Sequence, residues 1–205
     1  MSLLGDLALL SVAAALASCG TASPQLAAPT LLVTLAHQSA GEIATRDQLE
    51  RLQRAHDLSP WFFTQRIVID EESIPHSHPV LTLHARHQDS DDALLSTFIH
   101  EEIHWFLADR DEALARAVDQ LRAELPGLPV GFPDGADSEQ SSYEHLIVIL
   151  GERDGLVSLI GEARAAAVFA FWEGDHYRAL YRVLREHRDI VLRVARANDL
   201  VLRDQ

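Results

Sequence analysis

The chain has 205 residues, 47% of them hydrophobic and 23% charged, a balance that is typical of one globular domain and argues against wholesale disorder. Its formal net charge of -14 argues against a nucleic-acid partner, because a phosphate backbone would be repelled. One cysteine against eleven histidines excludes internal disulfides and thiolate zinc sites. Any protein-bound metal must therefore use His, Asp or Glu as its ligands.

Residues 1–19 have the features of an export signal. Residues 7–17 form an apolar run of signal-peptide length that is too short to span a bilayer as a helix. The run ends in Leu16-Ala17-Ser18-Cys19, which resembles the lipobox of bacterial lipoproteins. That resemblance implies a protein exported to the bacterial cell envelope, with a lipid anchor on Cys19 as its only membrane contact.

The segment before the apolar run departs from the signal pattern, because it contains Asp6 and no Lys or Arg. The alternative interpretation is a buried or frayed N-terminal helix with an incidental cysteine, in a cytoplasmic protein. Residues 20–29 are expected to form a tether, and residues 30–205 to form a single domain.

Three segments rich in β-branched or aromatic residues predict strands, at 30–36, 62–69 and 80–86. In the last of them Leu81 and Leu83 alternate with Thr82, which predicts a strand with one buried and one exposed face. A helix is expected at 45–57, where Thr45 and Gln48 match a capping box.

The rest of the chain predicts helices, which are expected at 89–108, 111–125, 142–150, 156–171 and 175–197. Glycines at 151, 155 and 174 mark the expected breaks, and residues 126–138 form a Gly/Pro-rich loop. Strands followed by helices indicate an α+β domain with a small β-sheet and a helical C-terminal half.

His100-Glu101-Glu102-Ile103-His104 is an HExxH sequence inside the helix at 89–108. Residues i and i+4 lie on one face of a helix, so both imidazoles can reach one metal ion. Glu101 lies about 100° around the helix from His100, where it can accept a proton from water without binding the metal.

This arrangement resembles the zincin metallopeptidases, in particular the gluzincins, over roughly residues 80–152. The resemblance implies that an edge strand of the sheet lies over the HExxH helix and lines a substrate cleft. It also implies a catalytic Zn²⁺ with a third protein ligand. The chain lacks the short-spaced third His of the metzincins, because Trp105, Phe106 and Leu107 follow the motif.

Three residues compete as the third ligand: His145 first, then Glu152 and Glu144. Glu144 has a structural explanation, since Ser141 and Glu144 fit a capping box at a helix start. His145 and Glu152 are separated by about 10 Å along a helix, so one can bind the metal while the other orients a ligand histidine. If His145 does not bind, Glu152 is the gluzincin-like alternative.

Several other side chains are candidates by analogy or by position. By analogy with zincins that use a distal His or Tyr, His176 and Tyr177 are candidates for stabilising an oxyanion, although a polar pair at a helix start is the simpler interpretation. The strand residues His84 and His87 are candidates for lining the cleft, or for an exposed sheet face. His76 and His78 are predicted to be surface residues or, alternatively, metal ligands. Trp105 and Trp172 are predicted to lie in the core.

These features predict a zinc-dependent hydrolase, more specifically a peptidase, that cleaves peptide or other amide bonds with Glu101 as general base. Two alternatives remain open. The first is a non-catalytic metal-binding or accessory lipoprotein of the cell envelope. The second is a helical interaction module in which the HExxH sequence is accidental. Substrate specificity and oligomeric state do not follow from the sequence.

Overall fold

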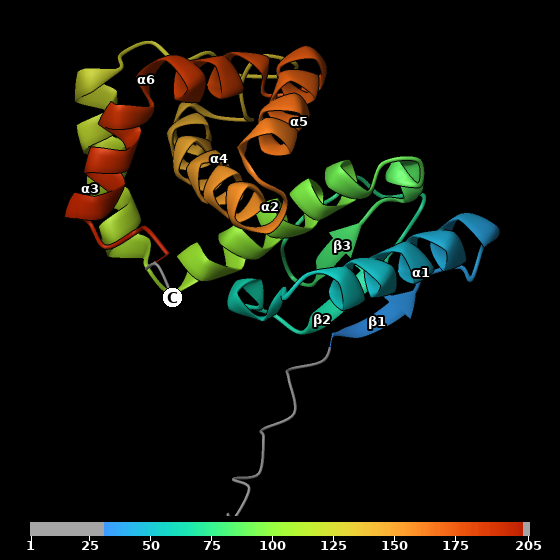
Figure 1. The fold of residues 1–205 in the computed structure, drawn as a ribbon. Coiled ribbons are helices and arrows are strands. Elements are labelled where there is room, and N and C mark those ends of the chain that lie inside the picture. The colour runs from blue at the N-terminus through green and yellow to red at the C-terminus, as the bar shows by residue number, and fades with distance from the viewer. Residues whose placement is uncertain (1–30, 203–205) are drawn as a thin grey trace, which may run out of the picture.

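The computed structural model describes residues 31–202, and the predicted signal, tether and lipid-anchor site lie outside this range. A three-stranded parallel sheet of order β1-β2-β3 forms the N-terminal part (Figure 1). Its strands are β1 (Leu32–Leu35), β2 (Arg66–Ile69) and β3 (Leu81–Leu83). Helix α1 (Ala40–Ala55) connects β1 to β2 and packs against both.

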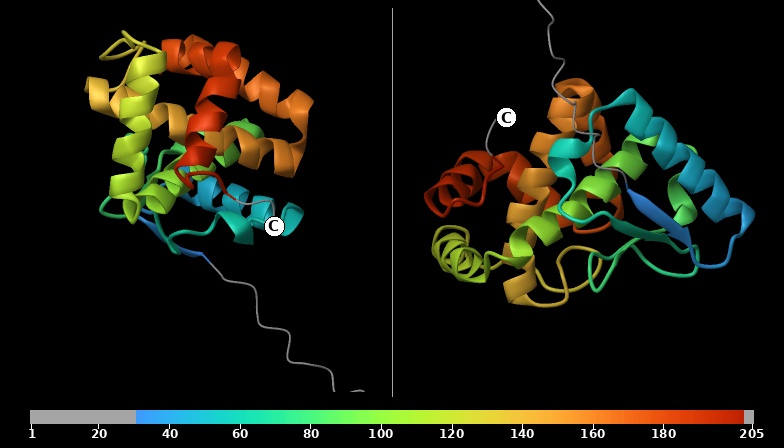
Figure 2. Two further views of the ribbon diagram at one scale, coloured as in Figure 1. Left: turned by 90° about the vertical axis from the view of Figure 1, so that its left-hand side faces the viewer. Right: turned by 90° about the horizontal axis from the view of Figure 1, so that it is seen from below.

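Five further helices make up the rest of the described chain: α2 (Asp91–Ala108), α3 (Asp111–Glu124), α4 (Glu139–Ile160), α5 (Glu162–Asp175) and α6 (Arg178–Ala197). Helix α2 contacts β3 on one side and α4 and α5 on another, so it lies between the sheet and the helical half (Figures 1 and 2). One hydrophobic core extends from Leu31 to Leu200. The predicted α+β class with a helical majority is confirmed.

Within residues 31–202, no helix combines the length and the apolar character that crossing a bilayer requires. The predicted bounds of α2 and α3 agree with the structure to within two residues. The start of α2 has a strong local signal, because Ser90 caps this helix by accepting a hydrogen bond from the Ala93 N–H at 3.2 Å.

The predicted start of the first helix is wrong. Helix α1 begins at Ala40, and Ser39 is its N-cap, accepting a hydrogen bond from the Glu42 N–H at 3.1 Å. Thr45 instead donates to the Gly41 carbonyl within the helix, and Gln48 is buried. A capping box can form only where the chain enters the helix, and it enters one and a half turns earlier.

The predicted strand at 62–69 is too long. The carboxylate of Glu102 accepts hydrogen bonds from the N–H groups of Phe63 and Thr64, at 2.8 and 2.9 Å. These two groups cannot join the sheet, and β2 begins only at Arg66.

The predicted half-exposed strand at 80–86 is also corrected, because all three residues of β3 are buried. The preceding loop folds back, and His76 exchanges two backbone hydrogen bonds with Thr82, at 2.8 and 3.2 Å. The loop therefore pairs with the outer edge of β3, and neither face of the strand stays exposed. Past the strand, a short 3-10 helix (Ala85–His87) replaces the expected strand end.

Helix α4 is one continuous helix where two were expected. Gly151 and Gly155 do not end it but allow close approach to α2: a Cβ at Gly151 would lie 2.9 Å from Ile103, and one at Gly155 would lie 3.0 Å from Ile99. The break falls at Gly161, whose φ of +81° favours glycine.

Candidate metal centre

Helix α2 presents the HExxH side chains toward the helical half of the molecule. His100 and Glu101 are 8% and 6% exposed, and His104 is half-buried. Leu95, Phe98 and Ile99 are fully buried around them, so the apolar face of α2 holds this helix in place. The two histidine rings have centroids 5.2 Å apart, as one turn of helix requires.

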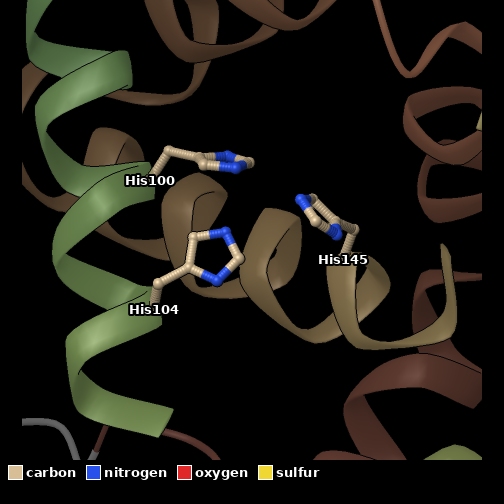
Figure 3. Close-up of side chains that lie close together, drawn as sticks. All are labelled: His100, His104 and His145. Carbon is tan, nitrogen blue, oxygen red and sulfur yellow. The ribbon is translucent and has the colours of Figure 1, made fainter. Parts of the chain in front are cut away.

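Helix α4 supplies a third imidazole to the same place. His145, near the start of α4, has its ring centroid 5.6 Å from that of His100 and 5.0 Å from that of His104. One ligand nitrogen from each of the three rings lies within 4.8 Å of the other two. Figure 3 shows the three side chains pointing toward one another from two helices. His145 is therefore the candidate third ligand that the structure brings to the HExxH pair.

The hydrogen bonds of these rings suit a cation. Nδ1 of His145 lies 2.7 Å from the Ser141 carbonyl oxygen, and Nδ1 of His100 lies 3.0 Å from Glu152 Oε2. A carbonyl and a carboxylate only accept, so each Nδ1 is the donor and Nε2 of the neutral ring keeps its lone pair. Neutral imidazoles whose other nitrogen is held in this way are typical zinc ligands.

The pKa values of these rings differ with their surroundings. Burial lowers the pKa of His145 to about 3, and the neighbouring His100 contributes in the same direction. Burial likewise holds the pKa of His104 well below its usual range. Burial also opposes the charged form of His100, but the hydrogen bond and the charge of Glu152 outweigh it and raise that pKa. Burial therefore favours the neutral, metal-binding form of His104 and His145.

Glu152 lies about two helical turns beyond His145 on α4. It is hydrogen-bonded to His100 and is not grouped with the three ligand nitrogens. It is fully buried, and Oε2 accepts hydrogen bonds from His100 and from the Tyr181 hydroxyl, both at 3.0 Å. Oε1 accepts from Ser96, whose oxygen in turn accepts from Trp172 Nε1 at 2.8 Å. Four helices thus meet at this one carboxylate, which orients the His100 ring.

Glu144, the last candidate ligand, lies outside the cluster. Its carboxylate accepts a hydrogen bond from Gln140 at 2.8 Å on the exposed side of α4. The capping box predicted for Ser141 and Glu144 is wrong as well, because Ser138 is the N-cap and accepts from the Ser141 N–H at 3.0 Å.

The histidine cluster opens into a cavity of about 480 Å³ that Glu101 also lines. Burial raises the pKa of Glu101 to about 7, while the charges of His100 and His76 oppose the shift. A carboxylate with that pKa accepts and returns protons near neutral pH. The cavity has the size of an ordinary small-ligand site.

The residues at the start of α6 line the same cavity. Tyr177 has a left-handed backbone (φ 48°, ψ 31°), which is rare for a bulky residue and typical of functional sites. Its ring lies 4.5 Å from that of His145, and burial raises the pKa of its hydroxyl to about 12, helped by the charge of Glu101. His176 donates from Nδ1 to Asp175 Oδ2 at 2.8 Å, and burial lowers its pKa.

The other candidate histidines lie outside the histidine cluster. His84 and His87 do not line the cavity, although Arg86 between them does. His87 is buried against Trp172, and burial lowers its pKa to about 4. Of the loop histidines, His78 stacks on the ring of Trp105 with centroids 4.1 Å apart. Trp105 is half-buried and packs against the core without lying fully inside it.

Trp172 is 2% exposed, as predicted, and also contributes to the cavity wall. Ser96, Tyr181 and Arg86 carry no signal in the sequence that predicts a place at this site. The first two are ordinary helix residues by pattern, and only their burial beside Glu152 distinguishes them.

A second group of close side chains consists of His37, Glu42 and Asp70, at the carboxyl ends of β1 and β2. The Glu42 carboxylate already accepts hydrogen bonds from the His37 N–H at 2.8 Å and its Nδ1 at 2.9 Å, and from the Glu71 N–H at 3.4 Å. We interpret this group as a structural tie between the two strand ends.

Comparison of the chain with protein-family models, with curated proteins and with solved structures gave no match. The geometry of the histidine cluster and its cavity is therefore the basis for a function.

Proposed function

We propose that this protein is a zinc-dependent hydrolase of peptide or other amide bonds. One observation carries the proposal: three imidazoles from two helices place their nitrogens within 4.8 Å of one another, in the cavity that Glu101 lines. In this proposal His100, His104 and His145 hold the metal. Three protein ligands and a position open to the cavity are the pattern of catalytic rather than structural zinc sites.

Zinc, when bound, lowers the pKa of a coordinated water to about 7 and polarises a carbonyl group. Glu101 takes the proton of the attacking water and delivers it to the leaving amine, a role that suits its raised pKa. Glu152 keeps the His100 ring in place through its bond to Nδ1.

Tyr177 is the residue that we assign to stabilisation of the oxyanion. Its hydroxyl keeps its proton near neutral pH, since its pKa is about 12, and it can donate a hydrogen bond to the negative oxygen. His176 lines the same cavity; because its Nδ1 donates to Asp175 and burial keeps the ring neutral, its Nε2 can accept a hydrogen bond from substrate but cannot donate one to an oxyanion.

The test is metal analysis of the full chain by inductively coupled plasma mass spectrometry, in parallel for wild type, His145→Ala and Glu144→Ala. We expect close to one zinc per chain in wild type and in Glu144→Ala, and loss of that zinc in His145→Ala. Glu144 neighbours His145 on α4 but lies outside the cluster, so it is the matched control.

Absence of metal from the wild-type protein, after zinc has been added and excess removed, would overturn the proposal. Such a result would favour the interaction-module interpretation. If metal is bound, screening of a peptide library follows, with wild type and Glu101→Gln compared under the same conditions.

A further inference from the structure

Two strongly exposed apolar side chains lie at the same cavity as the histidine cluster. Ile74 is 79% exposed and Phe132 is 83% exposed, and both line the cavity. A single exposed apolar side chain is ordinary on a protein surface. Two of them, contributed by separate loops to one cavity, place exposed apolar surface where a ligand would bind.

The loop that contains Phe132 is firmly attached to the helices on both sides of it. The Pro133 carbonyl accepts a hydrogen bond from the Arg178 N–H at 3.0 Å, which ties the loop to the start of α6. The Pro129 carbonyl accepts from Ser142 Oγ at 2.8 Å, which ties it to the start of α4. A loop that is anchored to α4 and α6 thus holds Phe132 outward. It lies beside the starts of these two helices, where His145 and Tyr177 are found.

The conformation of this loop also depends on a glycine that no other residue can replace. A Cβ at Gly135 would lie 2.0 Å from the Pro129 carbonyl oxygen, a distance that no side chain allows. The predicted Gly/Pro-rich loop is therefore part of the cavity wall.

The loop that contains Ile74 is anchored on the sheet. His76 exchanges two backbone hydrogen bonds with Thr82 of β3, and the Ile74 carbonyl accepts from His76 Nδ1 at 2.9 Å. The right-hand view of Figure 2 shows this loop and the loop of Phe132 on the same side of the molecule. Both apolar side chains are therefore carried to the cavity by anchored loops.

We propose that Phe132 and Ile74 form an apolar subsite, and that the preferred substrates are peptides with a large apolar side chain next to the scissile bond. This inference rests on the proposed function. An amide whose carbonyl lies at the histidine cluster extends its flanking side chains along the cavity wall, where these two residues stand. Covering them with a substrate side chain removes apolar surface of both partners from water.

The experiment uses two hydroxamates, of N-acetyl-phenylalanine and of N-acetyl-glycine, which bind an open metal position and are not turned over. Their dissociation constants are measured by calorimetry on the zinc-loaded full chain, for wild type, Phe132→Ala, Ile74→Ala and Leu32→Ala. Leu32, on β1, is 62% exposed and is not among the cavity residues, so it is the matched apolar control. Thermal unfolding confirms that each variant is folded.

We expect the phenylalanine hydroxamate to bind wild type at least about 10-fold more tightly than the glycine hydroxamate, as an apolar pocket discriminates. Phe132→Ala and Ile74→Ala should each lower that ratio about threefold or more, with little change for the glycine compound. Leu32→Ala should leave the ratio unchanged.

A ratio near one in wild type, or a ratio that neither variant changes, would overturn the subsite while leaving the metal site intact. If Phe132→Ala leaves the ratio unchanged but abolishes dimers in gel filtration, or abolishes binding to lipid vesicles, the patch serves self-association or membrane contact and the inference is wrong. If neither hydroxamate binds the zinc-loaded protein, the proposed function fails instead, because no open metal position exists.

Discussion

Glu101 differs from the surface carboxylates of the chain in being 6% exposed and facing the histidine cavity. We expect Glu101→Gln to keep its metal, because the side chain is not among the clustered ligands, and to lose about 10²–10⁴-fold in turnover through loss of the general base. Metal analysis and turnover of the same preparation test this. Unchanged turnover would contradict the role of Glu101, and a protein that binds zinc but turns over no substrate would be the non-catalytic metal-binding protein.

Glu152 acts on the metal through His100. Replacement by Gln removes the charge and one acceptor oxygen, and we expect zinc affinity to fall about 10–100-fold. Tyr181→Phe, which removes one donor and leaves the carboxylate, should have a smaller effect. Competition with a chromophoric chelator measures both. A loss as large as that of His145→Ala would make Glu152 a ligand, as in the gluzincin-like alternative.

At the scale of elements, the contact of α2 with α4 decides where the third imidazole lies. Gly155 leaves room for Ile99 and for Trp61, whose nearest ring atom would lie 3.1 Å from an added Cβ. We expect Gly155→Ala to lower the free energy of unfolding by about 1 kcal/mol, because overpacking outweighs the gain in helix propensity. Gly174→Ala, in α5 with nothing within 4 Å, should raise it by about 0.5 kcal/mol. Urea unfolding compares them, and stabilisation by both would show that the α2–α4 contact is loose.

The joint between β1, α1 and β2 depends on the buried carboxylate of Glu42. Although burial raises its pKa, backbone hydrogen bonds from His37, Glu71 and Gln38 and the side-chain bond of His37 outweigh this and bring it to about 2. A lowered pKa means that this contribution to stability is complete above the ordinary value of 4.5 and is lost as pH falls toward 2.

We therefore expect Glu42→Gln to lower the melting temperature at pH 7, with a difference from wild type that shrinks as pH falls from 5 toward 2. Thermal unfolding across this pH range measures the difference. A difference that does not change with pH would show that the carboxylate charge contributes nothing to the joint.

For the whole molecule, the candidate metal centre joins α2 to α4 and so connects the sheet-packed helix to the helical half. A ligand that binds only the folded state stabilises it, by about 2.7 kcal/mol at a free concentration 100 times its dissociation constant. We expect zinc at that level to raise the melting temperature by roughly 5–10 °C, and a chelator to reverse the rise. His145→Ala should show no rise. A rise of equal size in that variant would assign the binding to His37, Glu42 and Asp70 instead.

Local signals in the sequence were enough to predict the strand–helix order, the bounds of α2 and α3, and the placing of His100, Glu101 and His104 on one helix. Capping residues and the 3.6-residue period act over a few residues, so they can be recognised in the sequence itself. Local signals failed where contacts between distant residues intervene: Glu102 shortens β2, and tertiary packing buries the face of β3 that alternation predicted to be exposed.

The division of roles between His145 and Glu152 was left open by the sequence, which offered both at seven residues' spacing on one helix. Only the packing of α4 on α2 brings His145 beside the HExxH pair and buries Glu152 against the Nδ1 of His100. In the same packing, Gly151 and Gly155 lie within α4 and allow its close approach to α2, and they do not break the helix. Helix-forming signals are local and fixed by the chain, whereas contacts between helices exist only once the core has formed. The third imidazole and the carboxylate that holds His100 reach the candidate site through such contacts.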